Sequence, residues 1–449
     1  MRKAITAVAI MLVLCFALCS CSFTPIRSMD LLMQPPVFSN TDEKLIAAFE
    51  TSAGDNTVFC TPINGDYKSA VVVEDVDSDG EEEAFIFYKL KNGQETVRLN
   101  ILKKIGGEWK SVSDFTGSGT SVGSISFIDL DSDGIQEVFA GWRVGTSSGR
   151  ILSIFRQNSD RLSYHEIMNE SYSLMSSADI DGDGETEVLL ISQISNNTGN
   201  LNSAALYKCS GGKMNPAGNV TLDGNISSYV SVKGEKTSAE SPMRFYVDAL
   251  KGERMMITEV ISWDNSTANL VDPFVDPETF TNSATLRYEP IPSMDINGDG
   301  LIDIPTQSVI SEVEAGPESI DSYIPLYLTE WKNISDDGIG LETSVCSLIN
   351  TTGGYIFYLT ESDLEKAAVT AQTDKCWIFR ADVNGDGVYK DMFSLLIIDN
   401  ENWNEENAGS YTILSENENY RVCAFVSPDG EANGISGESV KEYFEQFTY

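Results

Sequence analysis

Short apolar runs alternate with acidic turns along most of the chain. The first unit contains four such runs, at residues 69–74, 84–89, 96–103 and 108–114, each rich in β-branched, aromatic or aliphatic residues. Runs of this length, bounded by Gly, Asp and Ser, are typical of β-strands rather than of helices. The pattern therefore predicts a mainly β protein built from four-stranded units, preceded by a short helix near residues 42–49.

An acidic loop of fixed spacing recurs between the first two runs of a unit. It has acids at its first, third and fifth positions, glycine at the sixth, an acid at the ninth and an apolar run after it. Four copies open at residues 75, 129, 179 and 295, and the last has Asn in third place. The candidate metal ligands are Asp75, Asp77, Asp79, Glu83, Asp129, Asp131, Asp133, Glu137, Asp179, Asp181, Asp183, Glu187, Asp295, Asn297, Asp299 and Asp303.

The spacing of these oxygen ligands suits calcium. Calcium takes about six to eight oxygens, and acids at alternate positions of a tight loop can converge on one point. The glycine allows the sharp turn, and the seventh carbonyl and the ninth acid complete the shell. An EF-hand would need Glu at position twelve, where this chain has Ile86, Ala140, Leu190 and Thr306. We therefore expect about four structural calcium ions, held in loops between strands.

The interval between loops predicts the architecture. The first three loops open 54 and 50 residues apart, and the 116 residues between the third and the fourth leave room for two units. The extra unit is expected to contain residues 246–257, with residues 248–252 as a loop that has lost its acids. A repeat of about 50 residues with several short strands indicates a β-propeller blade, so about five to seven four-stranded blades are expected.

The loops resemble the FG-GAP or VCBS repeats of the integrin α-chain propeller, over about residues 57–350. This resemblance implies that the acids at positions one, three, five and nine hold calcium. The literal Phe-Gly and Gly-Ala-Pro signatures are absent and no metal-ion-dependent adhesion insert is visible, so integrin-type ligand binding is not implied.

The tail differs from the repeats. Apolar runs predict strands at residues 353–359, 376–381, 392–398 and 420–426, and a terminal helix at 439–447. A fifth acidic loop opens at Asp382 but has Lys390 in ninth place, so we interpret it as an Asx-rich turn rather than a metal site. An alternative makes this loop part of the last blade of one closed ring. The expected divisions are a signal peptide at 1–20, a tether at 21–44, a β-propeller at 45–349 and a small α+β domain at 350–449.

The amino terminus has the features of a bacterial lipoprotein leader. Two basic residues precede an apolar run at 4–18, which is too short to span a bilayer but fits a secretory signal. The run ends in Leu18-Cys19-Ser20-Cys21, which resembles a lipobox with Cys21 as the lipidated residue. The order of this leader, the tether, the repeats and the tail resembles that of bacterial VCBS-repeat lipoproteins. We therefore expect a protein anchored by lipid to the extracytoplasmic face of the cell membrane.

Composition excludes several functions. The chain has 68 Asp and Glu against 30 Lys and Arg, a net charge of −38, which repels phosphate backbones and excludes nucleic-acid binding. Its single histidine, His165, rules out sites that need two histidines. The five cysteines after Cys21 contain no CxxC pair, so no zinc spacing is present.

These observations favour a binding protein. The leading hypothesis is a non-enzymatic, calcium-stabilised propeller that binds or scaffolds a protein or polysaccharide ligand outside the cell. The alternative is an extracytoplasmic polysaccharide hydrolase or lyase built on the same frame. The alternative would need convergent polar residues, and the one long irregular insertion, at 265–288, offers Asp272, Asp276 and Glu278.

Overall fold

The computed structural model describes residues 40–145, 149–196, 199–236, 243–311, 325–335, 338–360, 367–404 and 408–447. The expected signal peptide, Cys21 and most of the expected tether lie outside these ranges. Among the described residues, no helix has both the length and the apolar character to cross a bilayer.

The chain is mainly β, as predicted, and its strands form antiparallel sheets that follow one another in sequence order. The first sheet contains β1 (Thr57–Phe59), β2 (Val71–Glu74), β3 (Glu83–Leu90), β4 (Arg98–Ile105) and β5 (Glu108–Thr116). The second contains β6 (Ser121–Ile128), β7 (Glu137–Arg143), β8 (Arg150–Gln157) and β9 (Tyr164–Tyr172). The third contains β10 (Leu174–Ala178), β11 (Glu187–Asn196), β12 (Gly199–Ser210) and β13 (Lys213–Thr221).

Three further sheets complete the described chain. The fourth contains β14 (Ser228–Glu235), β15 (Arg244–Lys251), β16 (Met255–Asp264) and β17 (Asn269–Val271). The fifth contains β18 (Ile304–Ser311), β19 (Leu326–Ile334), β20 (Leu341–Asn350), β21 (Tyr355–Leu359) and β27 (Phe444–Gln446). The sixth contains β22 (Ala367–Thr373), β23 (Cys376–Ala381), β24 (Lys390–Asp399), β25 (Thr412–Glu416) and β26 (Tyr420–Val426).

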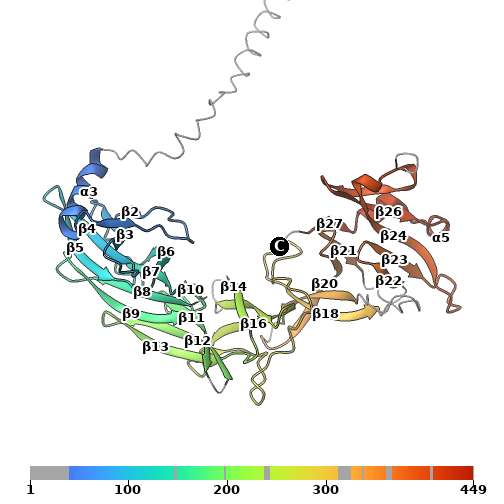
Figure 1. The fold of residues 1–449 in the computed structure, drawn as a ribbon. Helices are drawn as coiled ribbons and strands as arrows, with labels where there is room; N and C mark the ends of the chain where they lie inside the picture. Colours follow the sequence, from blue (N-terminus) through green and yellow to red (C-terminus); the bar gives the residue numbers. More distant parts are fainter. Residues whose placement is uncertain are drawn as a thin grey trace, which may run out of the picture.

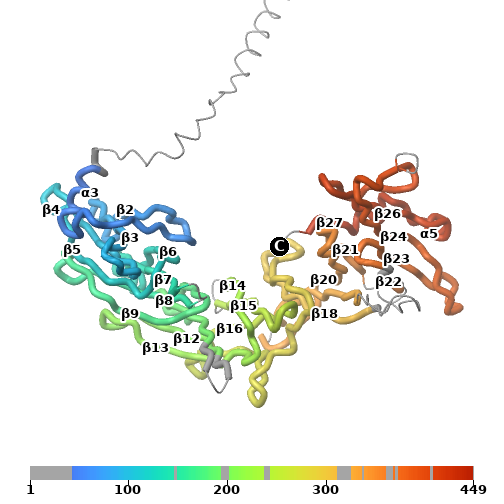
Figure 2. Tube along the Cα trace, viewed as in Figure 1, coloured from blue at the N-terminus to red at the C-terminus, as the bar shows by residue number. Residues whose placement is uncertain are grey.

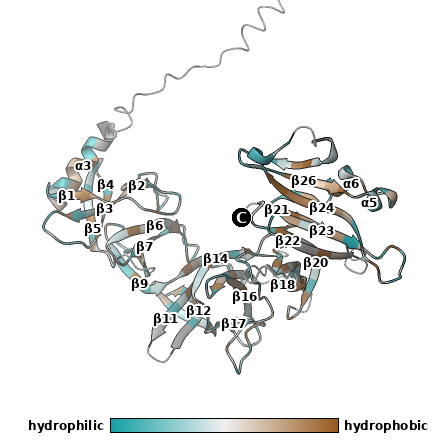
Figure 3. Ribbon diagram, turned by 45° about the vertical axis from the view of Figure 1, so that its right-hand side comes forward, coloured by the Kyte–Doolittle hydropathy of each residue, from teal (hydrophilic) through white to brown (hydrophobic). Residues whose placement is uncertain are grey.

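The sheets lie along an open arc (Figures 1 and 2). The first sheet, in blue, and the sixth, in red, stand at opposite ends of this arc, and the view turned by 45° shows the same opening (Figure 3). The second, third and fourth sheets have the four-stranded antiparallel order of a propeller blade, whereas the first, fifth and sixth sheets have five strands, and the sixth has the order β22-β23-β24-β26-β25. The ring of a closed propeller and its number of blades stay predictions.

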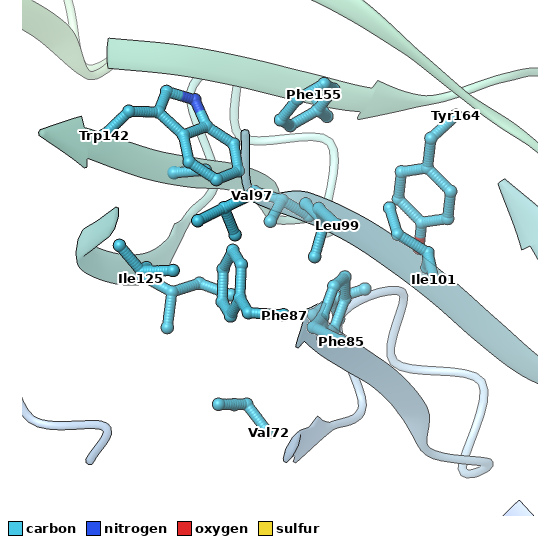
Figure 4. Close-up of a cluster of buried hydrophobic side chains, with 14 residues drawn as sticks. Val72, Phe85, Phe87, Val97, Leu99, Ile101, Ile125, Trp142, Phe155 and Tyr164 are labelled. Carbon is cyan, nitrogen blue, oxygen red and sulfur yellow. The ribbon is translucent and has the colours of Figure 1, made fainter. Parts of the chain in front are cut away.

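Apolar side chains between successive sheets hold the arc together. Figure 4 shows the contact between the first two sheets, where Phe87 of β3 lies near Trp142 of β7 and Phe85 lies on the side of Tyr164 of β9. Phe87 meets Trp142 edge to face, with ring centroids 5.8 Å apart. Residues at alternate positions of β3 point the other way, toward helix α3 (Asn40–Ala53). Because both faces of β3 are covered, its sequence is a continuous apolar run rather than an alternating one.

Helix α3 confirms the short helix predicted at residues 42–49. Its buried residues Leu45 and Phe49 pack on the outer face of the first sheet. Phe49 meets Tyr88 of β3 edge to face, with centroids 5.0 Å apart. The helix therefore covers the apolar face at which the series of sheets begins.

The fourth sheet confirms the extra unit that the interval predicted, but its acid plays another role. Residues 248–252 were expected to form a loop; instead Asp248 lies within β15 and is fully buried. Its carboxylate accepts hydrogen bonds from Arg287 Nη2 at 2.8 Å, from Thr258 Oγ1 at 2.9 Å and from Ser293 Oγ at 2.8 Å. Arg287 and Ser293 both follow β17, so this ion pair fixes the long segment between the fourth and fifth sheets.

The carboxyl-terminal segment differs from the prediction in two respects. The expected division between residues 349 and 350 falls within one hydrogen-bonded sheet, because β20 ends at Asn350 and pairs with β21. The helix expected at 439–447 is wrong over most of its length. Short helices α5 (Pro428–Ala432) and α6 (Gly437–Lys441) are followed by β27, which pairs with β21. Phe444 packs on Tyr355 and Phe447 faces Trp331, so tertiary contacts override the helical spacing.

We predict that the buried Asp248–Arg287 pair is essential to stability. Replacing Arg287 with Met leaves the Asp248 carboxylate buried without its cation, so the free energy of unfolding should fall by about 3–5 kcal/mol. Lys332→Gln is the control, because its pair with Glu330, at 3.4 Å, is partly exposed and should contribute less than about 1 kcal/mol. Urea unfolding followed by tryptophan fluorescence measures both; equal losses would contradict the assignment.

Candidate metal centres

Four of the five acidic loops share a pair of backbone hydrogen bonds to their first acid, whereas in the third loop the Asp179 carboxylate accepts from the Gly182 N–H at 2.8 Å. In the first loop the Asp75 carboxylate accepts hydrogen bonds from the N–H groups of Asp79 and Gly80, at 3.2 and 3.1 Å. The loops opening at 129, 295 and 382 repeat these two bonds at 2.8–3.2 Å. The glycine in sixth place has φ between +79° and +90° in all five loops, a conformation that side chains disfavour.

The acid in ninth place ties the two strands of each corner together. Glu83, Glu137, Glu187 and Asp303 are fully buried. Each accepts a hydrogen bond from the backbone N–H of the second loop residue, at 3.1, 3.0, 2.8 and 3.1 Å respectively. The ninth acid therefore has a structural role of its own, in addition to any contact with an ion.

Three loops bring their carboxylates close enough to hold a metal ion. Oxygens of the first, third and ninth acids lie within 4.8 Å of one another in the loops opening at 75, 129 and 179. The fifth-position acids Asp79, Asp133 and Asp183 each accept a hydrogen bond from the seventh residue's N–H, at 2.8–2.9 Å. The structure thus confirms that several acidic clusters of this chain could bind metal ions.

Basic residues on neighbouring strands contact the acids of the same three loops, and sequence reasoning missed them. Lys103 of β4 lies 2.9 Å from Glu83 Oε1 and 3.1 Å from Asp79 Oδ2, and also contacts Asp77. Arg156 of β8 and Lys208 of β12 make the equivalent contacts in the second and third loops. These residues stand on the strand next to the one that begins with the ninth acid, so only the sheet register could have revealed them.

Burial and charge pairing shift the protonation of these groups. Burial raises the pKa of Glu137 to about 7, although the Leu130 N–H and Arg156 oppose the change. Burial also raises the pKa of Glu83, against the effect of Lys103. Burial alone would lower the pKa of Lys103, but its hydrogen bonds to Asp77, Glu83 and Asp79 hold it well above the ordinary value. The basic residues therefore stay charged inside the clusters.

The fourth and fifth loops have different side chains at these positions. In the fourth, Asp303 accepts a hydrogen bond from Ser344, and its three acids are not among the groups gathered within 4.8 Å in the described chain. Continuing the β18–β19 register places Asn333, not a basic residue, opposite Asp303. In the fifth loop the charges are exchanged, because Lys390 in ninth place pairs with Asp429 at 2.8 Å.

Successive loops are bonded directly to one another. The N–H of Gln136 donates to the carbonyl of Val76 at 2.8 Å, and that of Thr186 donates to the carbonyl of Leu130 at 3.0 Å. The first three loops therefore form one continuous row along the same edge of the arc.

The acids of the irregular insertion have structural roles. Asp272 accepts hydrogen bonds from the N–H groups of Val260 and Phe274, at 3.1 and 2.9 Å. Asp276 accepts from the N–H groups of Glu278 and Thr279, at 2.9 and 2.8 Å, and so closes a turn. Among the described residues, the three acids named from the sequence are not gathered into one cluster with each other.

A buried acidic group does lie beside the insertion, and sequence reasoning missed it. Glu259 and Asp223 are fully buried, and the Asp223 N–H donates to Glu259 Oε1 at 2.5 Å. The group contains one cation, Lys251, at 2.6 Å from Asp223. Burial, together with Asp272 and Asp223, raises the pKa of Glu259, and burial raises that of Asp272 to about 7.

Comparison with known proteins does not assign this chain to a family. No protein-family model matches the chain, and no curated protein matches it. Among solved structures, an exotype rhamnogalacturonan lyase, YesX, matches with a TM-score of 0.23 and 10% identity, over 68% of this chain and 74% of that one. A rhamnogalacturonan lyase from Bacillus licheniformis matches with a TM-score of 0.26 and 12% identity, over 74% and 71%.

These matches correct one expectation. The sequence was interpreted as that of a protein that is not an enzyme, whereas both matched structures are of lyases, so that exclusion is withdrawn. TM-scores this low carry no argument for lyase activity in this chain.

We predict that the acidic group at the insertion makes stability depend on pH. The pKa of Asp272 is higher in the folded chain than in the unfolded one, so the folded state binds the additional proton between pH 4 and about 7. The free energy of unfolding should therefore fall as pH rises through this window. Asp272→Asn should remove up to about 1.4 kcal/mol of this loss per pH unit.

Urea unfolding at pH 5, 6 and 7 measures the effect. Asp276→Asn is the matched control, because backbone hydrogen bonds from Thr279 and Glu278 lower the pKa of Asp276, which places its titration below this window. The same pH slope in wild type and Asp272→Asn would contradict the prediction.

Proposed function

We propose that this chain is a lipid-anchored, calcium-binding repeat protein on the extracytoplasmic face of the cell membrane, where its sheets bind a protein or polysaccharide ligand. The observation that supports it best is the gathering of three carboxylates within 4.8 Å in each of three consecutive loops. Clusters of this kind need compensating positive charge, since carboxylates at such distances repel one another strongly. Each loop has four acids, and Lys103, Arg156 or Lys208 contributes a single positive charge to it, so a divalent cation would still be attracted.

Calcium suits these loops better than other metals. All the candidate ligands are oxygens, which hard cations prefer, and the described clusters contain neither histidine nor cysteine. Magnesium demands a tighter octahedron and gives up its waters reluctantly, whereas calcium accepts larger and irregular oxygen shells. In the proposal, the acids at positions one, three, five and nine hold the ion in each of the four loops.

The resemblance to VCBS and FG-GAP repeats becomes part of the proposal. A succession of antiparallel sheets, three of them with four strands, supports this part of the proposal, as do the backbone hydrogen bonds that join the first three loops. Display outside the cell follows from the leader and from Cys21, which lie outside the described residues. The concave and convex sides of the arc offer extended surfaces for a ligand (Figure 1).

We predict that calcium stabilises the protein through these loops. Adding a chelator should lower the melting temperature, and calcium should restore it more effectively than magnesium. At saturating calcium, native mass spectrometry should count about four ions. Asp299→Ala should remove one of them, and Asp386→Ala, in the loop with exchanged charges, should leave the count unchanged. An unchanged melting curve in chelator would contradict the calcium proposal.

We predict that the membrane anchor depends on Cys21. In cells expressing Cys21→Ser, the protein should leave the lipid-modified membrane fraction, because the residue that accepts the acyl chains is missing. Cell fractionation and labelling with a fatty-acid analogue measure this, and Cys19→Ser is the control that should remain labelled. A Cys21→Ser protein that is still processed and acylated would overturn the anchor.

The ligand can be sought directly. Glycan arrays and pull-downs with the mature protein in calcium test binding, and polysaccharides that bind should then be incubated to see whether they are cleaved. Binding without cleavage supports the proposed role, and cleavage would assign the chain to the enzymes.

A further inference from the structure

A basic side chain from a neighbouring strand contacts the acids of each of the first three loops. The Lys103 ammonium contacts the third, fifth and ninth acids of the first loop, at 3.1 Å from Asp79 and 2.9 Å from Glu83. Arg156 contacts the same three positions of the second loop, at 2.8, 2.8 and 3.2 Å. Lys208 repeats the pattern in the third, at 2.6 Å from Asp183 and 3.5 Å from Glu187.

Sheet register, not local sequence, places these side chains. Glu83 is paired with Lys103 across β3 and β4. Continuing the register of the next two sheets by one residue pairs Glu137 with Arg156 and Glu187 with Lys208. Lys103 is only 5% exposed, which distinguishes it from an ordinary surface lysine. The same position is therefore basic three times in succession.

The fourth and fifth loops support a role in charge pairing for the residue opposite the ninth loop residue. In the fifth loop the charges are reversed, with Lys390 in ninth place and Asp429 as its partner at 2.8 Å. In the fourth loop the residue opposite Asp303 is Asn333, which carries no charge. In four of the described loops, the charge of the ninth residue is therefore paired with an opposite charge on the neighbouring strand or segment. In the fourth loop, the residue opposite the ninth acid is uncharged.

We propose that Lys103, Arg156 and Lys208 are tethered counter-ions that compete with calcium for the first three loops. This rests on the proposed function, because it assumes that calcium enters these loops. A calcium ion must lie about 2.3–2.6 Å from the same oxygens that these side chains contact, so ion and side chain cannot occupy the centre together. Binding therefore requires the basic side chain to turn outward.

Two consequences follow from this competition. Without calcium the first three loops are held together by their own cations, so the sheets stay folded. When calcium is bound, the displaced Lys or Arg side chain remains near it. The repulsion between the two positive charges lowers the affinity of the loop for calcium. The first three loops should therefore fill at higher calcium than the same loops would without the basic residue.

The test compares Lys103→Gln with Lys104→Gln. Both substitutions remove one positive charge from neighbouring positions of β4, but Lys104 pairs with Glu82 at 3.3 Å outside the metal position. Native mass spectrometry across buffered free calcium should show one ion of Lys103→Gln binding at least about tenfold more tightly than in wild type. Lys104→Gln should match wild type, and adding Asp79→Ala to Lys103→Gln should abolish the tight ion.

A second readout covers the calcium-free state. In chelator, Lys103→Gln should melt several degrees below Lys104→Gln, because Asp77 and Glu83 lose their buried cation. Lys208→Gln, at the most exposed of the three basic residues, repeats the test if Lys103→Gln does not fold.

The outcomes separate this inference from the proposed function. Unchanged calcium midpoints in both Lys103→Gln and Lys208→Gln, while the ion removed by Asp299→Ala still binds, would overturn the competition and leave the calcium proposal intact. If no ion binds to any of these proteins, including at the fourth loop, both would be overturned.

Discussion

The hydrogen bond from the second loop residue to the buried ninth acid is the interaction on which the four repeats with a complete acidic loop depend. It joins the end of one strand to the start of the next, and it places a carboxylate such as Glu83 or Glu137 inside the protein. A buried carboxylate is costly unless it is paired, so this corner must recruit positive charge. In three repeats the next strand supplies that charge from Lys103, Arg156 or Lys208, and in the proposed function calcium supplies more.

This corner also determines how one sheet follows another. The backbone bonds from Gln136 to Val76 and from Thr186 to Leu130 link consecutive loops, while apolar clusters such as that around Trp142 fill the space behind them. The fourth sheet lacks the acidic loop and relies on the buried pair of Asp248 and Arg287 instead. The arc is thus held by two kinds of charge pairing together with continuous apolar packing between sheets.

Local patterns predicted the strands and the loops, because both are encoded by near neighbours: β23 and β26 have the predicted bounds, and the glycines in sixth place adopt positive φ. The cations could not be predicted, since Lys103 reaches Glu83 only through strand pairing. The helix predicted for the segment ending at Phe447 was wrong for the same reason. Its apolar spacing fits a helix, but pairing with the edge of β21 and contacts with Tyr355 and Trp331 make part of it a strand.

The competition between the basic side chains and calcium is tested most directly by a pair of crystal structures at low and at saturating calcium, with anomalous scattering to locate the ions. If Lys103 is a tethered counter-ion, its Nζ lies against Glu83 in the first loop at low calcium. At saturating calcium an ion takes this place, and the lysine side chain points outward. An ion bound in the first loop at low calcium, or carboxylates of Asp77 and Glu83 that stay apart from both ion and lysine, would contradict this competition.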